Sequence, residues 1–493
     1  MKTREQWGSR VGFVLAAIGS AIGLGNIWRF PYVAYENGGG AFFIPYLFAM
    51  LTAGIPFMIL EFGAGSKLKG SAPKIFSRLS PRWEWLGWWQ ILVSFTISIY
   101  YVAVVGWSIS YFFLAFNQGW GTDTGTYFFK SYLMLSDSPM DFKGLRWPIM
   151  AAVAGAWFIC WVVLFKGVKK GIEAASKIFM PVLFILVLII TGRAIFLEGA
   201  AGGLNWMFAP DFSKLLDVKV WVAAYGQIFF SLSIGFAIML TYSSYLPEDA
   251  DMANNGFITA FANCGFSILC GVLVFSVLGN MAAQQGVGVD KVVSSGVGLA
   301  FVTIPKAINS LPGPALFGTL FFLALIFAGL SSMVSICEVS IASLMEKFDI
   351  SRKKAVTIYC LVGIVSGAIF ASHSGLLVLD IVDRFINNFG VLAGGLVEII
   401  FLTWVCKLDV FKEHINKTSD FRVGGLWVFC LKFITPAVLG YMSIKNLIGD
   451  LSTPYGGDPA LSLAIFGWLM VIGIVVLSFI FQAHSLKQRG GVQ

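Results

Sequence analysis

Long apolar runs separated by short polar loops occupy almost the whole chain. Each run approaches or exceeds the ~20 residues that an α-helix needs to cross a bilayer. We expect helices near 11–36, 41–66, 88–116, 148–165, 176–196, 219–244, 256–281, 314–345, 355–371, 376–405, 424–447 and 460–483. Segments of about ten residues with alternating polarity, which mark a transmembrane β-barrel, do not recur. The pattern predicts an all-α integral membrane protein with about twelve spans.

The first apolar run is interrupted by residues that weaken a helix. Its segment GSAIGLGNIWRF, residues 19–30, contains Gly19, Gly23 and Gly25, and then places Asn26 and Arg29 at membrane depth. Each glycine costs a helix interior about 1 kcal/mol relative to alanine. A break also exposes backbone N–H and C=O groups, which lipid cannot satisfy unless they face a cavity or a ligand. The residues alone leave two interpretations open: a helix unwound at mid-membrane, or small residues that let two helices pack closely.

An interruption of the same kind occurs in the sixth run. In YGQIFFSLSIGFAIMLTY, residues 225–242, the apolar sequence is broken by Ser231, Ser233 and Gly235. The N-terminal end of a half-helix attracts a carboxylate, and the free carbonyls at a C-terminal end attract a cation. Two such interrupted segments in corresponding halves of a chain indicate the ligand site of a transporter. We therefore expect spans one and six to be unwound around a common site.

Composition supports a single membrane-embedded domain over residues 1–493. The chain is 57% hydrophobic and only 12% charged, whereas soluble domains carry about 25% charged residues. The longest polar stretches are loops near 117–147, 197–218 and 282–313. No soluble domain is expected.

The net charge of +8 is distributed in a way that favours a membrane over nucleic acid. Basic residues gather in alternate loops, at Lys67, Lys69, Lys74, Arg78 and Arg82; at Lys166, Lys169, Lys170 and Lys177; at Lys347, Arg352, Lys353 and Lys354; and at Lys407, Lys412, Lys417 and Arg422. This is the positive-inside pattern, to which the acidic loop LPEDADMANN is an exception of little weight. We expect a multi-pass protein of the cell membrane with both termini in the cytoplasm and no cleavable signal peptide.

The sequence contains no residue pattern that indicates an enzyme active site or a metal site. The seven cysteines lie almost entirely within or at the ends of apolar runs, so no structural disulfide is expected in the loop 117–147. The three histidines are scattered, and no metal-ligand spacing or nucleophile–base pair occurs. We expect a protein that is not an enzyme.

Several motifs resemble those of the neurotransmitter:sodium symporter family. They are GSAIGLGNIWRFPYVAYENGGGAFFIPY, GIPFMILEFGAG, GQIFFSLSIGF, FAGLSS and LKFITPAV, which together span most of the chain. The resemblance implies a twelve-helix fold with two inverted five-helix repeats, here about 8–196 and 219–405, followed by two helices about 424–483. It also implies co-transport of Na⁺ with an amino acid or an amine.

The resemblance further implies two Na⁺ sites. The first would use Ala21, Asn26, Ser231 and Asn263 together with the substrate carboxylate. The second would use the carbonyls of Gly19, Ile22 and Ala328 with the hydroxyls of Ser331 and Ser332. All of these groups offer the oxygen ligands that a hard cation prefers.

The position of Gly23 indicates the kind of substrate. Amine transporters of the family have an aspartate there, whereas glycine leaves room for a substrate carboxylate, so we expect a neutral amino acid. The implied substrate site comprises Ser20, Ala21, Gly23, Gly25, Ile97, Tyr101, Phe230, Ser231, Ser233, Phe236, Ser332, Ser335 and Ile336. In it Tyr101 would bind the carboxylate and Phe230 would close over the site.

A chloride site is expected beside the first Na⁺ site. Bacterial members of the family often carry a carboxylate at the position of Ser267, four residues after Asn263 on one helix face. Here uncharged groups match the chloride site of the family, at Tyr46, Gln227, Ser231, Asn263 and Ser267. Because bound Na⁺ needs a compensating anion at low dielectric, we expect chloride to be required or to stimulate. The alternative is that Ser267 only bonds to its own helix.

Ionisable residues at membrane depth are functional candidates. Arg29 and Asp383 match an outer gate, and Arg4 and Glu346, with Tyr245 nearby, match an inner gate. Trp7 would anchor the N-terminal segment. Glu61, Glu338 and Glu398 are expected to support the broken helices by hydrogen bonding.

Two alternatives to a Na⁺-coupled symporter remain. One is a proton-coupled amino-acid permease of related fold, and the other is an amino-acid sensor that does not transport.

Overall fold

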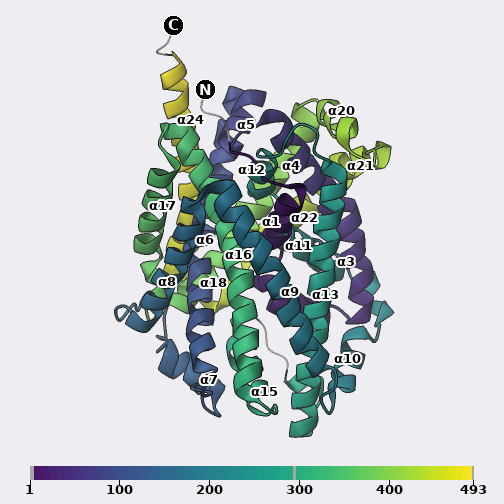
Figure 1. Cartoon of the computed structure of the whole chain (residues 1–493), viewed down its shortest axis with the longest axis vertical. Helices are drawn as coiled ribbons and strands as arrows, with labels where there is room; N and C mark the ends of the chain where they lie inside the picture. Colours follow the sequence, from purple (N-terminus) through teal and green to yellow (C-terminus); the bar gives the residue numbers. More distant parts are fainter. Residues whose placement is uncertain (1–4, 293–295, 491–493) are drawn as a thin grey trace.

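The computed structural model describes residues 5–292 and 296–490, with side chains up to residue 484. Within these ranges the chain is a bundle of helices without β-strands. Figure 1 shows the long helices running along the same direction, with several short helices at the two ends of the bundle. The predicted all-α membrane class is confirmed.

Ten helices in the described part of the chain are long and apolar enough to cross a membrane. They are Gly40–Leu68, Pro81–Leu114, Trp147–Phe165, Val168–Ala194, Met252–Gln285, Pro314–Phe348, Arg352–Ala371, Gly375–Val405, Gly425–Gly457 and Ala460–His484. The bent pair α1 (Arg10–Ala21) and α2 (Leu24–Glu36) makes an eleventh candidate span. The twelfth span and the inverted repeats stay predictions.

The following α-helices make up most of these spans. They are α4 (Ile55–Leu68), α6 (Glu84–Leu114), α8 (Trp147–Phe165), α9 (Ala174–Ala194), α13 (Met252–Gln285), α16 (Pro314–Phe348), α17 (Arg352–Gly367), α18 (Gly375–Phe385), α19 (Leu392–Ile400), α22 (Thr435–Ser452) and α24 (Met470–Gly490).

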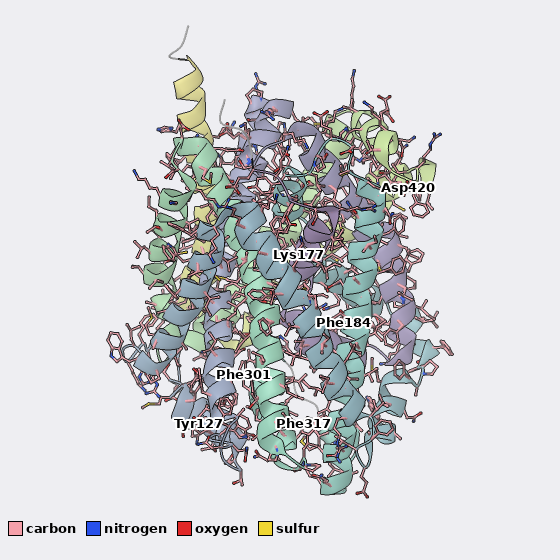
Figure 2. All side chains as sticks on the ribbon, in the orientation of Figure 1. Tyr127, Lys177, Phe184, Phe301, Phe317 and Asp420 are labelled. Carbon is pink, nitrogen blue, oxygen red and sulfur yellow. The ribbon has the colours of Figure 1, made fainter. Side chains whose placement is uncertain are left out.

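The short helices separate into two groups at opposite ends of the bundle. Figure 1 shows α5 (Ala72–Leu79) and α20 (Leu408–Thr418) at one end, and α7 (Thr124–Thr126), α10 (Ala200–Phe208) and α15 (Ile304–Asn309) at the other. Figure 2 places Asp420 at the first end, and Tyr127, Phe301 and Phe317 at the second. The first end carries the basic loops of the sequence, and we call it the basic end.

The first helix breaks where the glycines are concentrated. Helix α1 ends at Ala21, and Ile22 and Gly23 adopt extended backbone before α2 begins at Leu24, at an angle of 51°. The Asn26 Oδ1 accepts a hydrogen bond of 2.9 Å from the Gly23 N–H and so caps the new helix. An Asn near a helix start satisfies donors that have no partner within the helix.

A second break separates α11 (Val218–Ser231) from α12 (Ile238–Ser243). Three residues between these helices have positive φ: Ser233 at 54°, Gly235 at 85° and Ala237 at 70°. Such angles are uncommon for residues with a side chain. A left-handed backbone of this kind cannot continue an α-helix, so it turns the chain out of α11.

Buried glutamates support the second break. The Glu61 Oε1 accepts from the Gly235 N–H at 3.3 Å, and the Gln90 Nε2 donates to the Gly235 carbonyl at 3.3 Å and to Glu398. Both glutamates are fully buried. These contacts fit the hydrogen-bonding role expected of Glu61 and Glu398.

Candidate functional site

The two helix breaks face a common cavity. It has a volume of about 390 Å³ and is bounded by the breaks together with α6, α16 and α18. Twelve of the thirteen predicted substrate residues line it: Ser20, Ala21, Gly23, Gly25, Ile97, Tyr101, Phe230, Ser231, Ser233, Phe236, Ser332 and Ile336. The other, Ser335, lies behind Ser20, because its hydroxyl donates to the Ser20 Oγ at 2.9 Å.

Polar side chains from three helices meet beside the first break. The Asn26 Nδ2 lies 3.2 Å from the Ser231 Oγ, 2.8 Å from the Asn263 Oδ1 and 2.8 Å from the Ser267 Oγ. The Asn263 amide also contacts Ser231 at 2.7 Å. All four side chains are buried. Residues from α2, α11 and α13 thus form one cluster of neutral oxygen and amide groups.

A second group of oxygens surrounds the end of α1. The Ser332 Oγ donates toward the carbonyls of Gly19, Ser20 and Ile22 at 3.2 to 3.4 Å. On α16 the Ser331 Oγ lies 3.0 Å from the Ala328 carbonyl. The free carbonyls exist because α1 stops at Ala21 and leaves its last C=O groups without helical partners.

The glycines of the first break let side chains approach the backbone closely. A Cβ on Gly23 would lie 2.9 Å from the Ser332 Oγ and 3.2 Å from the Tyr101 Oη. A Cβ on Gly25 would lie 2.4 Å from the Phe230 ring. The Tyr101 hydroxyl also accepts from the Leu24 N–H at 3.3 Å. The break therefore presents the N-terminal end of α2 and a phenol to the same part of the cavity.

Arg29 and Asp383 lie further along the same cavity. The Arg29 guanidinium stacks 4.1 Å from the centre of the Phe230 ring. The Asp383 Oδ1 accepts from Tyr100 at 2.6 Å and from Asn387 at 2.8 Å. Among the residues that the structure describes, no arginine or lysine forms an ion pair with Asp383. The two predicted gate residues face one cavity without being joined.

The predicted inner gate is resolved in part. Arg4 lies outside the described residues, and Glu346 accepts from the Ser71 N–H at 3.0 Å and the Ser71 hydroxyl at 2.8 Å. Tyr245 donates to Glu338 at 2.7 Å, and Glu338 also forms a buried ion pair with Arg352. Glu338 therefore ties α16 to the start of α17.

The N-terminal segment is fixed to α12. The indole N–H of Trp7 donates to the Tyr242 carbonyl at 2.8 Å, and the backbone N–H of Trp7 donates to the Tyr245 carbonyl at 3.2 Å. The Trp7 ring is 8% exposed and contacts Phe13 and Tyr242 edge to face. Through these contacts Trp7 holds the segment before α1 against Tyr242 and Tyr245.

Two buried side chains of the predicted chloride site, Tyr46 and Gln227, carry polar atoms without hydrogen-bond partners. The Tyr46 hydroxyl and both polar atoms of the Gln227 amide make no hydrogen bond within the described residues, and each residue is at most 1% exposed. The Tyr46 hydroxyl lies beside Ser267. Gln227 stands one helical turn before Ser231 on α11. Buried polar groups are usually satisfied, so the unpaired atoms of these two side chains suggest a ligand that accepts hydrogen bonds.

The structure also adds cavity residues that sequence reasoning missed. They are Leu24, Trp28, Tyr32, Tyr100, Val104, Val297, Leu376, Leu379, Asp380, Arg384, Asn387, Asn388, Val391 and Tyr455. Asp380 and Arg384 carried a readable signal, because both are ionisable residues within a predicted span, and Asp380 stands one helical turn before Asp383 and shares its face.

Comparison with known proteins agrees with this architecture. The model of the sodium:neurotransmitter symporter family matches residues 4–127 and 120–488. An uncharacterized sodium-dependent transporter of Methanocaldococcus jannaschii is 42% identical over 97% of both chains. The sodium- and chloride-dependent GABA transporter 2 of Mus musculus is 29% identical over 99% of this chain and 88% of its own.

A sodium-dependent dopamine transporter of Caenorhabditis elegans is also 29% identical, over 92% of this chain and 82% of its own. Members of the matched family are transporters and not enzymes. The resemblance of the sequence motifs is confirmed, and this chain belongs to the sodium:neurotransmitter symporter family of sodium-dependent membrane transporters.

Proposed function

We propose that this protein couples the inward movement of Na⁺ and chloride to the uptake of a neutral amino acid by alternating access. The observation that carries the proposal is the break at Ile22–Gly23, which exposes carbonyls of α1 and N–H groups of α2 to one cavity. Such a break offers ligands for a cation and for a carboxylate at adjacent positions.

Two Na⁺ ions would bind on either side of the break. The first site would use Ala21, Asn26, Ser231 and Asn263 with the substrate carboxylate, and the second would use Gly19, Ile22, Ala328, Ser331 and Ser332. Contacts of 2.7 to 3.2 Å within the first set, and of 3.0 to 3.4 Å within the second, support this grouping. Coupling would follow because the carboxylate and the first Na⁺ share a contact.

The substrate would bind with its carboxylate at Gly23 and Tyr101. Glycine supplies no carboxylate for a substrate ammonium, which favours an amino acid over a monoamine. Ile97, Phe236 and Ile336 would form an apolar subsite for the side chain. Because Ser335 bonds to Ser20 and does not line the cavity, it adds no hydroxyl to that subsite.

Chloride would bind between Tyr46, Gln227, Ser231, Asn263 and Ser267. The unpaired, buried donors of Tyr46 and Gln227 support an anion there, and the named chloride dependence of the murine GABA transporter agrees with it. The test is Na⁺-driven uptake with gluconate in place of chloride. A lower rate in gluconate is expected, and an unchanged rate would refute the chloride site.

The basic end of the bundle would face the cytoplasm of the cell. The clusters of Lys and Arg in its loops support this orientation, which places both termini inside. Alternating access would then close the Arg29–Asp383 pair above the substrate before the opposite end opens. A ligand drives such a change only through its different affinity for the two states.

A thermal-shift screen of the purified protein identifies the substrate. Each common amino acid is tested with Na⁺, with K⁺, and with chloride or gluconate. A ligand at 100 times its Kd stabilises the folded state by about 2.7 kcal/mol. Stabilisation by neutral amino acids only when Na⁺ is present is expected; stabilisation by monoamines alone would refute the assignment.

A further inference from the structure

A second arginine lines the mouth of the cavity directly beside the gate aspartate. Arg384 follows Asp383 at the end of α18, and both border the cavity with Arg29. Two cations therefore face one gate carboxylate. For Arg29 to close on Asp383, the charge of Arg384 has to be held away or neutralised, since a like charge disfavours its approach.

The structure contains a partner for that second charge. The Arg384 Nη2 lies 2.9 Å from the Asp450 Oδ1 on α22, and the Asp450 side chain is only 5% exposed. The Arg384 guanidinium also lies 5.2 Å from the centre of the Tyr455 ring. Its side chain is thereby drawn toward the outer end of α22.

A second contact runs alongside the first. The amides of Asn446 and Asn388 lie 3.1 Å apart, and with the Asn388 amide oriented to satisfy its neighbours, its Oδ1 accepts from the Arg384 Nε at 2.9 Å. Asn446 and Asp450 are four residues apart on α22, as are Arg384 and Asn388 on the other segment, so each pair shares one helix face. The two contacts fix the direction in which Arg384 extends.

Asp383 keeps a free charge under this arrangement. Its carboxylate accepts hydrogen bonds from Tyr100 and Asn387, which are neutral donors. Asp380, which also lines the cavity, bonds to Tyr455 and lies near Asp458. The charge of Arg384 is thus compensated by Asp450, while that of Asp383 is left for Arg29.

We propose that Asp450 is a positioning residue that holds and neutralises Arg384, so that Arg29 is the cation that closes the outer gate on Asp383. The inference rests on the proposed transport function for its gate. The role of Asp450 requires only that the mouth of the cavity opens and closes, whatever the substrate is. If Asp450 is lost, Arg384 competes with Arg29 through its charge, and the mouth stays open for longer.

A double-mutant cycle tests the role of charge. Asp450→Asn should reduce Na⁺-dependent uptake of L-alanine and L-leucine into proteoliposomes about tenfold. Arg384 itself lines the cavity, so Arg384→Gln sets its own reference rate; the double variant should transport at the rate of Arg384→Gln alone and faster than Asp450→Asn. The control is Asp458→Asn, which removes an acid eight residues further along the chain that forms no ion pair with Arg384 within the described residues and lies near Asp380.

A labelling measurement keeps the proposal testable whatever the substrate proves to be. Val104→Cys places a thiol in the cavity on α6, and its rate of reaction with a membrane-impermeant methanethiosulfonate reports how often the mouth is open. Asp450→Asn should raise that rate, and adding Arg384→Gln should restore it. Failure of the proposed function would be seen separately, as absent uptake by the wild type.

Two results would overturn the inference. One is a labelling rate in Asp450→Asn equal to that in Asp458→Asn. The other is a defect of Asp450→Asn that persists in the double variant, because the contact would then stabilise the fold and not compensate a charge.

Discussion

Gly23→Ala is the substitution whose effect follows most directly from the geometry. The added Cβ would lie 2.9 Å from the Ser332 Oγ and 3.2 Å from the Tyr101 Oη. Ordinary contacts begin at 3.4 Å, so both hydroxyls must shift. The φ of Gly23 is −129°, which alanine adopts without strain, so the effect is confined to space in the site.

The crowding of the Ser332 and Tyr101 hydroxyls by the added methyl group sets the expected loss of affinity in Gly23→Ala. Overpacking by a methyl group costs about 1 to 3 kcal/mol, which corresponds to a loss of affinity of about 5- to 150-fold. We expect the loss to fall on amino-acid binding and on Na⁺ activation together. Ser332 contacts the carbonyls proposed to bind the second Na⁺, and Tyr101 accepts from the Leu24 N–H at the proposed carboxylate position.

The assay is Na⁺-dependent uptake into proteoliposomes over a range of amino-acid and Na⁺ concentrations. The matched control is Gly192→Ala on α9, where a Cβ would meet nothing within 4 Å. Its KM should equal that of the wild type. A wild-type KM in Gly23→Ala as well would refute the placement of the substrate carboxylate at this break.

Three further predictions address the ions and the basic end. Asn26→Leu should reduce the thermal stabilisation of the protein by Na⁺, because it removes a ligand of the first proposed Na⁺ site and leaves the second, and an undiminished shift would contradict the first site. Ser267→Glu supplies a fixed negative charge, so uptake should become independent of chloride; continued stimulation by chloride over gluconate would contradict the anion site. Burial, together with the positive charges of Lys67 and Lys69, lowers the pKa of His414 below 6.5. On acidification the unfolded chain therefore binds a proton at His414 at a higher pH than the folded protein does, and the free energy of unfolding decreases. His414→Gln should lessen the fall in melting temperature between about pH 7.5 and about pH 5.5, and an equal fall in both proteins would contradict this reasoning.

The helix breaks were readable from the sequence because their residues are locally unfavourable. Glycines and buried polar residues in an apolar run are costly, and they predicted interruptions that the structure places at Ile22–Gly23 and at 232–237. The resemblance to a known family then assigned residues from distant helices to one site. The structure brings Asn26, Ser231 and Asn263 into contact.

Contacts between side chains far apart in the chain could not be predicted from the sequence. No local pattern shows that Ser335 turns to Ser20, or that Arg384 pairs with Asp450 across 66 positions. Helix rotation and the tilt of packed segments decide such contacts, and a period of 3.6 residues specifies neither. At the mouth of the cavity the sequence therefore identified the gate pair Arg29 and Asp383 but missed the residues around it, whereas the centre was found.

Accumulation of an amino acid against its gradient tests the central claim most directly. Proteoliposomes are loaded with K⁺ and diluted into Na⁺ and chloride with a radiolabelled neutral amino acid, and the internal concentration is followed. The account predicts transient accumulation above the external concentration, lost when K⁺ replaces external Na⁺. Accumulation that persists without Na⁺ and follows an imposed pH gradient would contradict it.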